Sequence, residues 1–151
     1  MDDVAASVDK LQHDIAIRAM LEQVCAATEM GFAAVARVTD TRWVACQVLD
    51  RIEFGLEPGD ELDLKTTICD EIRGNCTAVV IDHVSADTAW RSHPTPILYG
   101  FESYISFPIM LADGSFFGTL CAIDPRPREI ATPAIVALFE RFSREIADLL
   151  D

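Results

Sequence analysis

A β-hairpin in the last third of the chain limits the possible folds more than any other feature of the sequence. Two apolar runs, residues 103–111 (SYISFPIML) and 116–124 (FFGTLCAID), flank the turn segment 112–115 (ADGS). Asp-Gly between two alternating apolar segments is a strong hairpin signal, because both residues accept the backbone angles that tight turns require. The two runs are therefore predicted to pair as antiparallel strands.

Side chains alternate between the two faces of a strand, so residues 103–111 are expected to present two unlike faces. One face mixes polar and aromatic groups, and the other carries only aliphatic and aromatic groups. The mixed face suits a pocket, whereas the apolar face suits packing against helices. The two sets are Tyr104, Ser106 and Pro108 on the mixed face, and Ile105, Phe107 and Ile109 on the apolar face.

The segments around the hairpin predict an α+β fold. Apolar residues recur at helical spacing over residues 4–30 in two adjoining stripes, which predicts one helix with several neighbours that ends at Gly31. Thr132 followed by Pro133 is typical of a helix start, and an apolar stripe follows. Helices at both ends with an antiparallel sheet between them indicate the α+β class. The other predicted segments are strands over 32–39, 43–49 and 77–82, an acidic loop over 57–61, and a short helix from Thr67 to about Gly74.

The chain of 151 residues is predicted to be one domain over residues 1–151. It divides into an N-terminal helix (1–30), a sheet and pocket segment (31–130) and a C-terminal helix (131–151). A chain of this length buries enough surface to fold without disulfides or metals. Because the last helical pattern continues to the end of the sequence, we expect the chain to be part of a longer protein.

The charge of the chain argues against two classes of partner. Twelve Lys and Arg stand against 25 Asp and Glu, which gives a formal net charge of −13. Nucleic acids and anionic membranes both favour clustered Lys and Arg. Neither nucleic acid nor a membrane surface is therefore expected as a partner.

The sequence also predicts a cytoplasmic protein with reduced thiols. It begins Met1-Asp2-Asp3, without the basic and apolar segments of a signal peptide, and no run is long enough to span a membrane. The five cysteines are odd in number and form no CxxC pair, so neither a disulfide framework nor a zinc site is expected. Cys46 and Cys121 lie in strand-like apolar runs, where cysteine acts as a small buried hydrophobic residue.

From Thr66 onward the sequence resembles the GAF domain family, in the form found in bacterial sensor histidine kinases and diguanylate cyclases. The resemblance is carried by TTICDEI, AVVIDHVSAD and HPTPILYGFESYISFPIMLADGSFFGTLCAIDPRPR. The hairpin turn, Gly118 and the aspartate that ends the second strand lie where the family places them. The resemblance extends over essentially the whole chain. It implies a central antiparallel sheet with the terminal helices on one face, and short helices and loops over a small-molecule pocket on the other.

The candidate ligand-binding residues come from the irregular segment 83–102 and from the mixed face of the hairpin. A connection this long inside a compact domain is often functional. On the returning strand, Thr119, Cys121 and Ile123 share one side. The predicted ligand-binding set is Trp90, Arg91, His93, Tyr99, Phe101, Tyr104, Ser106, Thr119 and Cys121.

The resemblance implies a sensory domain of bacterial signal transduction. Such a domain binds a small molecule, here unidentified, and relays its state through the terminal helices to an output module such as a histidine kinase or a cyclase. It also implies homodimers that form through the terminal helices. We expect no catalytic residue and no metal site in this chain.

Several alternatives stay open. Cys69 and Cys76 allow a redox enzyme similar to the GAF-type methionine sulfoxide reductases, although the segment 90–96 lacks the cysteine that this family places there. Bilin-binding GAF domains attach their chromophore to a cysteine beside a histidine. Because His93 has no cysteine beside it, we expect no covalent bilin, and non-covalent binding stays open. Cyclic nucleotides are disfavoured, since only Arg91 among the candidates is basic. A ligand-free dimerisation module is the last alternative.

Overall fold

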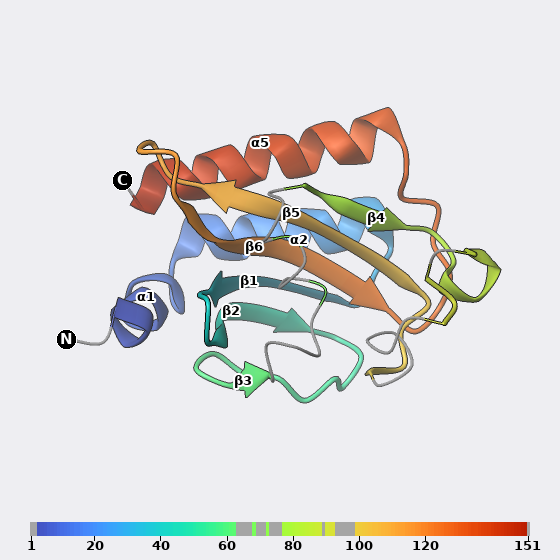
Figure 1. Ribbon diagram of the computed structural model, residues 1–151, viewed down its shortest axis with the longest axis horizontal. Helices are drawn as coiled ribbons and strands as arrows, with labels where there is room; N and C mark the ends of the chain where they lie inside the picture. The colour runs from blue at the N-terminus through green and yellow to red at the C-terminus, as the bar shows by residue number, and fades with distance from the viewer. Residues whose placement is uncertain are drawn as a thin grey trace.

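A six-stranded antiparallel sheet forms the centre of the molecule, in the strand order β3-β2-β1-β6-β5-β4 (Figure 1). The structure is a computed structural model that describes residues 3–62, 68, 72, 77–88, 90–92 and 99–150. The strands are β1 (Phe32–Val38), β2 (Trp43–Asp50), β3 (Glu61–Leu62), β4 (Val79–Ile81), β5 (Ser103–Met110) and β6 (Phe116–Asp124). The helices are α1 (Asp3–Leu11), α2 (Ile15–Thr28), α5 (Pro133–Leu150) and the 3-10 helix η2 (Val84–Ala86).

The predicted α+β class is confirmed, and the predicted hairpin is the β5–β6 pair. Its register runs from Ser103 opposite Asp124 to Met110 opposite Phe116. Asp113 closes the turn, because its carboxylate accepts hydrogen bonds from both the backbone N–H and the hydroxyl of Ser115. The predicted strands over 32–39, 43–49 and 77–82 are confirmed as β1, β2 and β4.

Strand β3 was not predicted, because its first residue, Glu61, was assigned to an acidic loop and Leu62 to no element. It pairs with the first two residues of β2, Trp43 opposite Leu62 and Val44 opposite Glu61. A two-residue strand is too short to show alternation in a sequence, so its pairing partner defines it. The predicted short helix from Thr67 lies largely outside the described residues, where only Ile68 and Ile72 are described.

The N-terminal segment corrects the prediction of one helix over residues 4–30. It forms α1 and α2, which are separated by Gln12, His13 and Asp14. The Asp14 carboxylate accepts a hydrogen bond from the N–H of Ile17 at 3.0 Å and so caps the start of α2. The two apolar stripes that seemed to share one helix therefore belong to two helices.

A buried glutamine on β2 fixes the break between these helices. Gln47 is only 3% exposed. Its side-chain amide donates hydrogen bonds to the carbonyl oxygens of Leu11 at 2.6 Å and Asp14 at 3.2 Å. The Leu11 carbonyl also accepts from the N–H of Asp14 at 3.2 Å, and the Asp14 carbonyl from the N–H of Arg18 at 3.0 Å, so the amide supplies a second donor to each.

We therefore expect Gln47→Leu to lower the free energy of unfolding by about 1–3 kcal/mol, because it removes the two hydrogen bonds that the buried amide donates. Urea unfolding followed by circular dichroism measures the change. Gln23→Leu is the matched control, since Gln23 is exposed on α2, and it should change stability by less than about 0.5 kcal/mol. Equal effects of the two substitutions would show that Gln47 contributes no specific contact.

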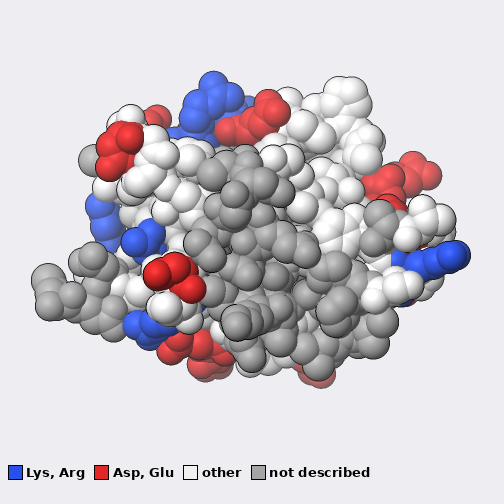
Figure 2. Space-filling view, in the orientation of Figure 1, with Lys and Arg blue, Asp and Glu red and all other residues white. Residues whose placement is uncertain are grey.

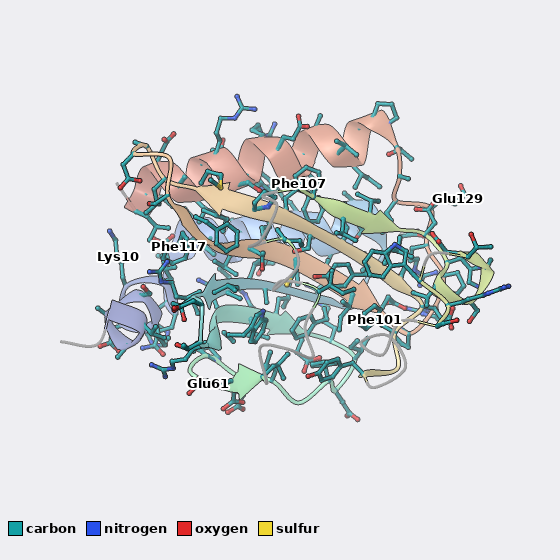
Figure 3. All side chains as sticks on the ribbon, in the orientation of Figure 1. Lys10, Glu61, Phe101, Phe107, Phe117 and Glu129 are labelled. Atoms are coloured by element: carbon teal, nitrogen blue, oxygen red, sulfur yellow. The ribbon has the colours of Figure 1, made fainter. Side chains whose placement is uncertain are left out.

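The sheet separates two apolar clusters. Helices α1 and α2 pack on β1 and β2, and α5 packs on β5 and β6, so all three cover one face (Figure 1). Their cluster includes Leu120, Phe107 and Phe139, whereas the cluster on the other face includes Cys121 and Phe101. Figure 3 shows Phe107 beside α5 and Phe101 near the loops in front of the sheet. No helix in the described part of the chain combines the length and apolarity needed to span a bilayer.

Two aspartates connect the sheet to the segments that lead into its helices. Asp124 ends β6 and is fully buried; its carboxylate accepts hydrogen bonds from the N–H of Gly31 at 2.9 Å and of Arg126 at 2.8 Å. Asp82 follows β4, and its carboxylate accepts from the N–H groups of Ile130 and Ala131, both at 2.9 Å. These bonds hold the start of β1 and the approach to α5 against the sheet.

Candidate functional site

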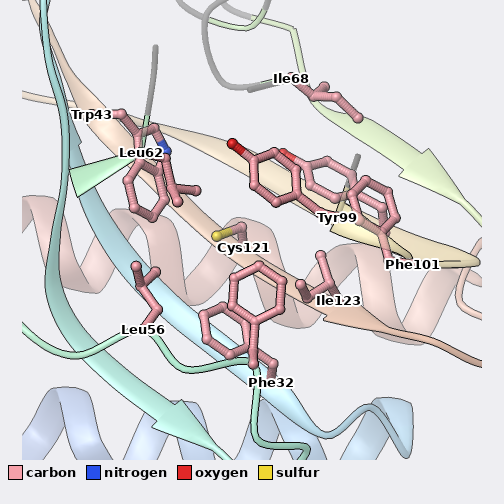
Figure 4. A pocket seen from close by; sticks show the side chains of 11 residues that line it. Phe32, Trp43, Leu56, Leu62, Ile68, Tyr99, Phe101, Cys121 and Ile123 are labelled. Atoms are coloured by element: carbon pink, nitrogen blue, oxygen red, sulfur yellow. The ribbon is translucent and has the colours of Figure 1, made fainter. Parts of the chain in front are cut away.

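An apolar pocket lies on the face of the sheet opposite α1, α2 and α5 (Figure 4). Figure 2 shows this side of the molecule, on which the described charged side chains lie mostly toward the periphery. Six of the eleven lining residues are aromatic, and they include both tyrosines of the chain. The lining residues are Phe32, Trp43, Phe54, Leu56, Leu62, Ile68, Tyr99, Phe101, Tyr104, Cys121 and Ile123.

Strand alternation explains why the sheet contributes these side chains. Phe32 begins β1, while Cys121 and Ile123 occupy alternate positions of β6. In the β1–β6 register Phe32 stands opposite Ile123, so the two side chains lie next to each other on the same face. Trp43 begins β2 and Tyr104 is the second residue of β5, which places the floor of the pocket across four strands.

The loop after β2 supplies one wall, and Asp50 organises it. Its carboxylate accepts hydrogen bonds from the N–H groups of Ile52 and Phe54, each at 3.1 Å, and of Gly55 at 2.9 Å. Gly55 has a φ of 92°, a left-handed conformation that glycine adopts without steric cost. The loop is thereby folded back so that Phe54 and Leu56 reach the pocket.

The aromatic rings of the pocket contact one another in two groups. The centroid of Phe54 lies 5.0 Å from that of Phe32 and 6.1 Å from that of Tyr99, with tilted rings in both pairs. Phe101 and Tyr104 are stacked, with their centroids 5.3 Å apart. These separations lie in the range of favourable aromatic pairs, so the rings also stabilise the shape of the pocket.

The pocket lined by these eleven residues, called the chamber below, has a volume of about 40 Å³. An adjoining cavity of about 460 Å³ shares six lining residues with it and adds five others. The shared residues are Phe54, Leu56, Leu62, Tyr99, Phe101 and Ile123, and the added ones are Ile52, Glu53, Gly55, Gly100 and Pro125. Among the described residues, no charged side chain lines the chamber, and Glu53 is the one charged residue that lines the adjoining cavity.

Four of the predicted site residues lie together in this pocket: Tyr99, Phe101, Tyr104 and Cys121. Ser106 and Thr119 are fully buried and do not line it. Trp90 packs, half-buried, against the pocket-side cluster, while Arg91 is exposed, and neither residue lines the chamber. His93 lies outside the described residues.

Sequence reasoning missed the residues that β1, β2 and the loop after β2 bring to the pocket. Phe32 and Trp43 stand at strand starts, and alternation along those strands carries a usable signal, because Phe32, Ala34 and Ala36 all belong to the pocket-side cluster. Phe54 lies in a segment without periodicity, so only the loop conformation set by Asp50 brings it to the site.

The thiols of Cys25 and Cys46 are unsuited to redox chemistry. Both are buried, as is Cys121. Burial raises the pKa of Cys25 above its ordinary value and raises the pKa of Cys46 to about 12. The thiols of Cys25 and Cys46 therefore stay protonated at neutral pH, whereas the thiolate is the reactive form. Cys69 and Cys76 lie outside the described residues.

The GAF domain family matches residues 13–150. That range includes α2, all six strands and α5, so the chain belongs to the GAF domain family. No curated protein sequence matches the chain.

Solved structures agree on the fold. The GAF domain of a phosphoenolpyruvate-protein phosphotransferase from Acinetobacter superposes with a TM-score of 0.70 at 10% identity, over 99% of this chain and 94% of that chain. The GAF domain of a two-component sensor histidine kinase from Bacillus halodurans gives 0.68 at 11% identity, over 92% and 93%.

A third similar structure is an enzyme. The type II free methionine-R-sulfoxide reductase from Thermoplasma acidophilum gives a TM-score of 0.66 at 11% identity, over 89% of each chain. Identities this low show the shared fold and leave the activity to be argued from the site.

Proposed function

We propose that this GAF domain is a sensory domain that binds a small molecule in the pocket and relays its presence through the terminal helices. The observation that carries the proposal is the aromatic pocket on the face of the sheet opposite α1, α2 and α5. A concave apolar site with a few polar groups is the usual form of a small-molecule site. The family membership supports it, since sensor proteins are among the similar structures.

The structure offers a short route from the pocket to the helices. On β5, Tyr104 lines the pocket, and the adjacent Ile105 belongs to the helix-side cluster. Further along the same strand, the ring of Phe107 lies 5.6 Å from that of Phe139 on α5. A ligand that prefers one position of Tyr104 thereby favours one packing of β5 on α5, which is a shift between two populations.

The proposal extends to the molecules around the domain. We place it in the cytoplasm, as a homodimer formed through its terminal helices, with a histidine kinase or a cyclase as the output module. The chain itself is proposed to carry no enzymatic activity. The raised pKa values of Cys25 and Cys46 support this view against a reductase that uses those thiols.

A pocket-filling substitution tests the proposal, with ethylbenzene as an apolar probe. We expect saturable binding to the purified domain in ligand-observed NMR. Cys121→Phe should weaken binding at least about tenfold, because a side chain much larger than cysteine closes the chamber, whereas Cys121→Ala should change it less than about threefold. Native mass spectrometry and an absorption spectrum of the purified protein report any retained natural ligand and the oligomeric state.

Two results would contradict the proposal. If Cys121→Phe binds ethylbenzene as tightly as the wild-type protein does, the pocket is not the ligand site. If binding leaves the NMR resonances of Phe139 and Ile146 on α5 unchanged, the relay to the helices is wrong. Thermal unfolding of each variant confirms that it is folded.

A further inference from the structure

The loop of residues 51–56, which follows β2, brings Phe54 to the pocket in a backbone conformation that is unfavourable by itself. Glu53 has a φ of 55° and Gly55 a φ of 92°, so the residues on both sides of Phe54 lie in the left-handed region. Glu53 has a Cβ atom, and this region costs such a residue about 1–2 kcal/mol. The loop therefore depends on contacts that hold it in this conformation.

Asp50 supplies such contacts from a fixed point. It is the last residue of β2 and pairs with Phe32 in the β1–β2 register, so its backbone belongs to the sheet. Its Oδ1 accepts hydrogen bonds from the N–H groups of Ile52 and Phe54, and its Oδ2 accepts one from Gly55. Hydrogen bonds to a carboxylate are stronger than those between uncharged groups. The three bonds thus hold the loop backbone before, at and after Phe54.

The ring of Phe54 links two parts of the pocket wall that are far apart in the sequence. Its centroid lies 5.0 Å from that of Phe32 on β1 and 6.1 Å from that of Tyr99, which precedes β5. Phe54 lines both the chamber and the adjoining cavity. Its place in the wall is set by the loop, whereas Phe32 is held by its strand.

Asp50 itself lines neither the chamber nor the adjoining cavity. A molecule bound there contacts the Phe54 ring, so Asp50 can act on it only through the loop. When a binding-competent arrangement is populated for a fraction of the time, the apparent dissociation constant rises in inverse proportion to that fraction. Loss of the three bonds would lower the fraction of time that Phe54 spends in the wall.

We infer that Asp50 is a positioning residue of the ligand site, which sets the affinity of the pocket by holding Phe54 against Phe32 and Tyr99. The inference rests on the proposed function, because it concerns ligand binding in the same pocket. It adds that a carboxylate outside an apolar site controls how tightly the site binds.

The position of Phe54 is measured first, by NMR of the free domain. NOEs between the ring protons of Phe54 and those of Phe32 and Tyr99 report the two contacts. We expect these NOEs in the wild type and in Asp60→Ala, and their loss in Asp50→Ala. Asp60 is the matched control, since its carboxylate accepts a backbone N–H, that of Glu57 at 2.9 Å, and it lines neither cavity.

The dissociation constant of ethylbenzene is then measured by NMR titration. We expect Asp50→Ala to weaken binding at least about fivefold, which corresponds to Phe54 in place about one fifth of the time. Asp60→Ala should change binding less than about twofold. Asp50→Asn should fall between the two, because it keeps the oxygen that accepts from Ile52 and Phe54 and replaces the acceptor of Gly55 with an NH2 group.

A double-mutant cycle separates positioning from a general loss of structure. Phe54→Ala removes the ring, so Asp50→Ala in that background should weaken ethylbenzene binding less than about twofold further. Urea unfolding of each variant confirms that it is folded.

The possible failures are distinguishable. NOEs that persist in Asp50→Ala, or an equal loss of affinity with and without the Phe54 ring, would overturn the inference and leave the proposed function standing. The NOE comparison needs no ligand, so it can overturn the inference whether or not ethylbenzene binds. If Cys121→Phe binds ethylbenzene as tightly as the wild type, the proposed function fails and the inference fails with it.

Discussion

Gly118→Ala should lower the free energy of unfolding by about 3 kcal/mol or more, a large part of the roughly 5–15 kcal/mol that stabilises a typical domain. Gly118 lies in β6, opposite Arg37 of β1 and Ile109 of β5. A Cβ atom at this position would overlap the backbone carbonyl of Ala36. Because the obstacle is backbone inside a paired sheet, no side-chain rotation relieves it, and β1 must move away from β6.

Urea unfolding of the purified variant measures this effect. The matched control is Gly59→Ala, because a Cβ atom at Gly59 would meet nothing within 4 Å. Gly59 has a φ of 92°, so its replacement carries a backbone cost of about 1–2 kcal/mol without a clash. A loss at Gly118 no larger than the loss at Gly59 would show that the two strands separate more easily than the structure implies.

Asp124→Ala is expected to lower stability by about 2–4 kcal/mol at neutral pH. The substitution leaves the buried N–H of Gly31 without an acceptor and removes the charged hydrogen bonds to Arg126. Asp148→Ala is the control, because it removes an exposed carboxylate from α5 and should change stability by less than about 0.5 kcal/mol.

This effect should depend on pH. Burial alone would raise the pKa of Asp124, but hydrogen bonds from Arg126 and Gly31, together with the charge of Arg126, hold the pKa below its ordinary value. A carboxylate with a lowered pKa stabilises the folded state above the pKa of the unfolded chain, and this contribution disappears as the pH falls through the folded value.

The difference in stability between wild type and Asp124→Ala should therefore be largest near neutral pH and shrink from about pH 5 downward. Urea unfolding of both proteins at a series of pH values tests this. A difference that stays constant down to pH 3 would mean that the charge of Asp124 contributes nothing beyond its shape.

Local signals in the sequence predicted most of the sheet. The Asp-Gly turn and the alternating runs around it predicted β5 and β6, and their alternation placed Tyr104 and Ile105 on opposite faces, as the two clusters confirm. The break after α1 was not predicted, because Gln47, whose amide donates hydrogen bonds to the carbonyls on either side of the break, lies 36 positions beyond Leu11. Such a long-range hydrogen bond leaves no trace in local periodicity.

The candidate site was predicted less completely than the fold. Aromatic residues near the hairpin were recognised, because a long irregular segment beside a strand is itself a signal. Phe54 and Trp43 were missed, since their place depends on the loop that Asp50 folds and on the pairing of β2 with β1. That Trp43 Nε1 has no hydrogen-bond partner among the described residues is a property of three-dimensional packing alone.

Alternate residues of each central strand belong to two different apolar clusters, one on each face of the sheet. This arrangement determines which substitutions the domain can accept independently of one another. Neighbouring residues of β6, such as Leu120 and Cys121, belong to different clusters and have few packing partners in common. Substitutions at pocket-facing positions can accumulate while the contacts under α5 are preserved. A library confined to those positions can thus vary the lining of the pocket while the packing of the sheet against α5 is kept.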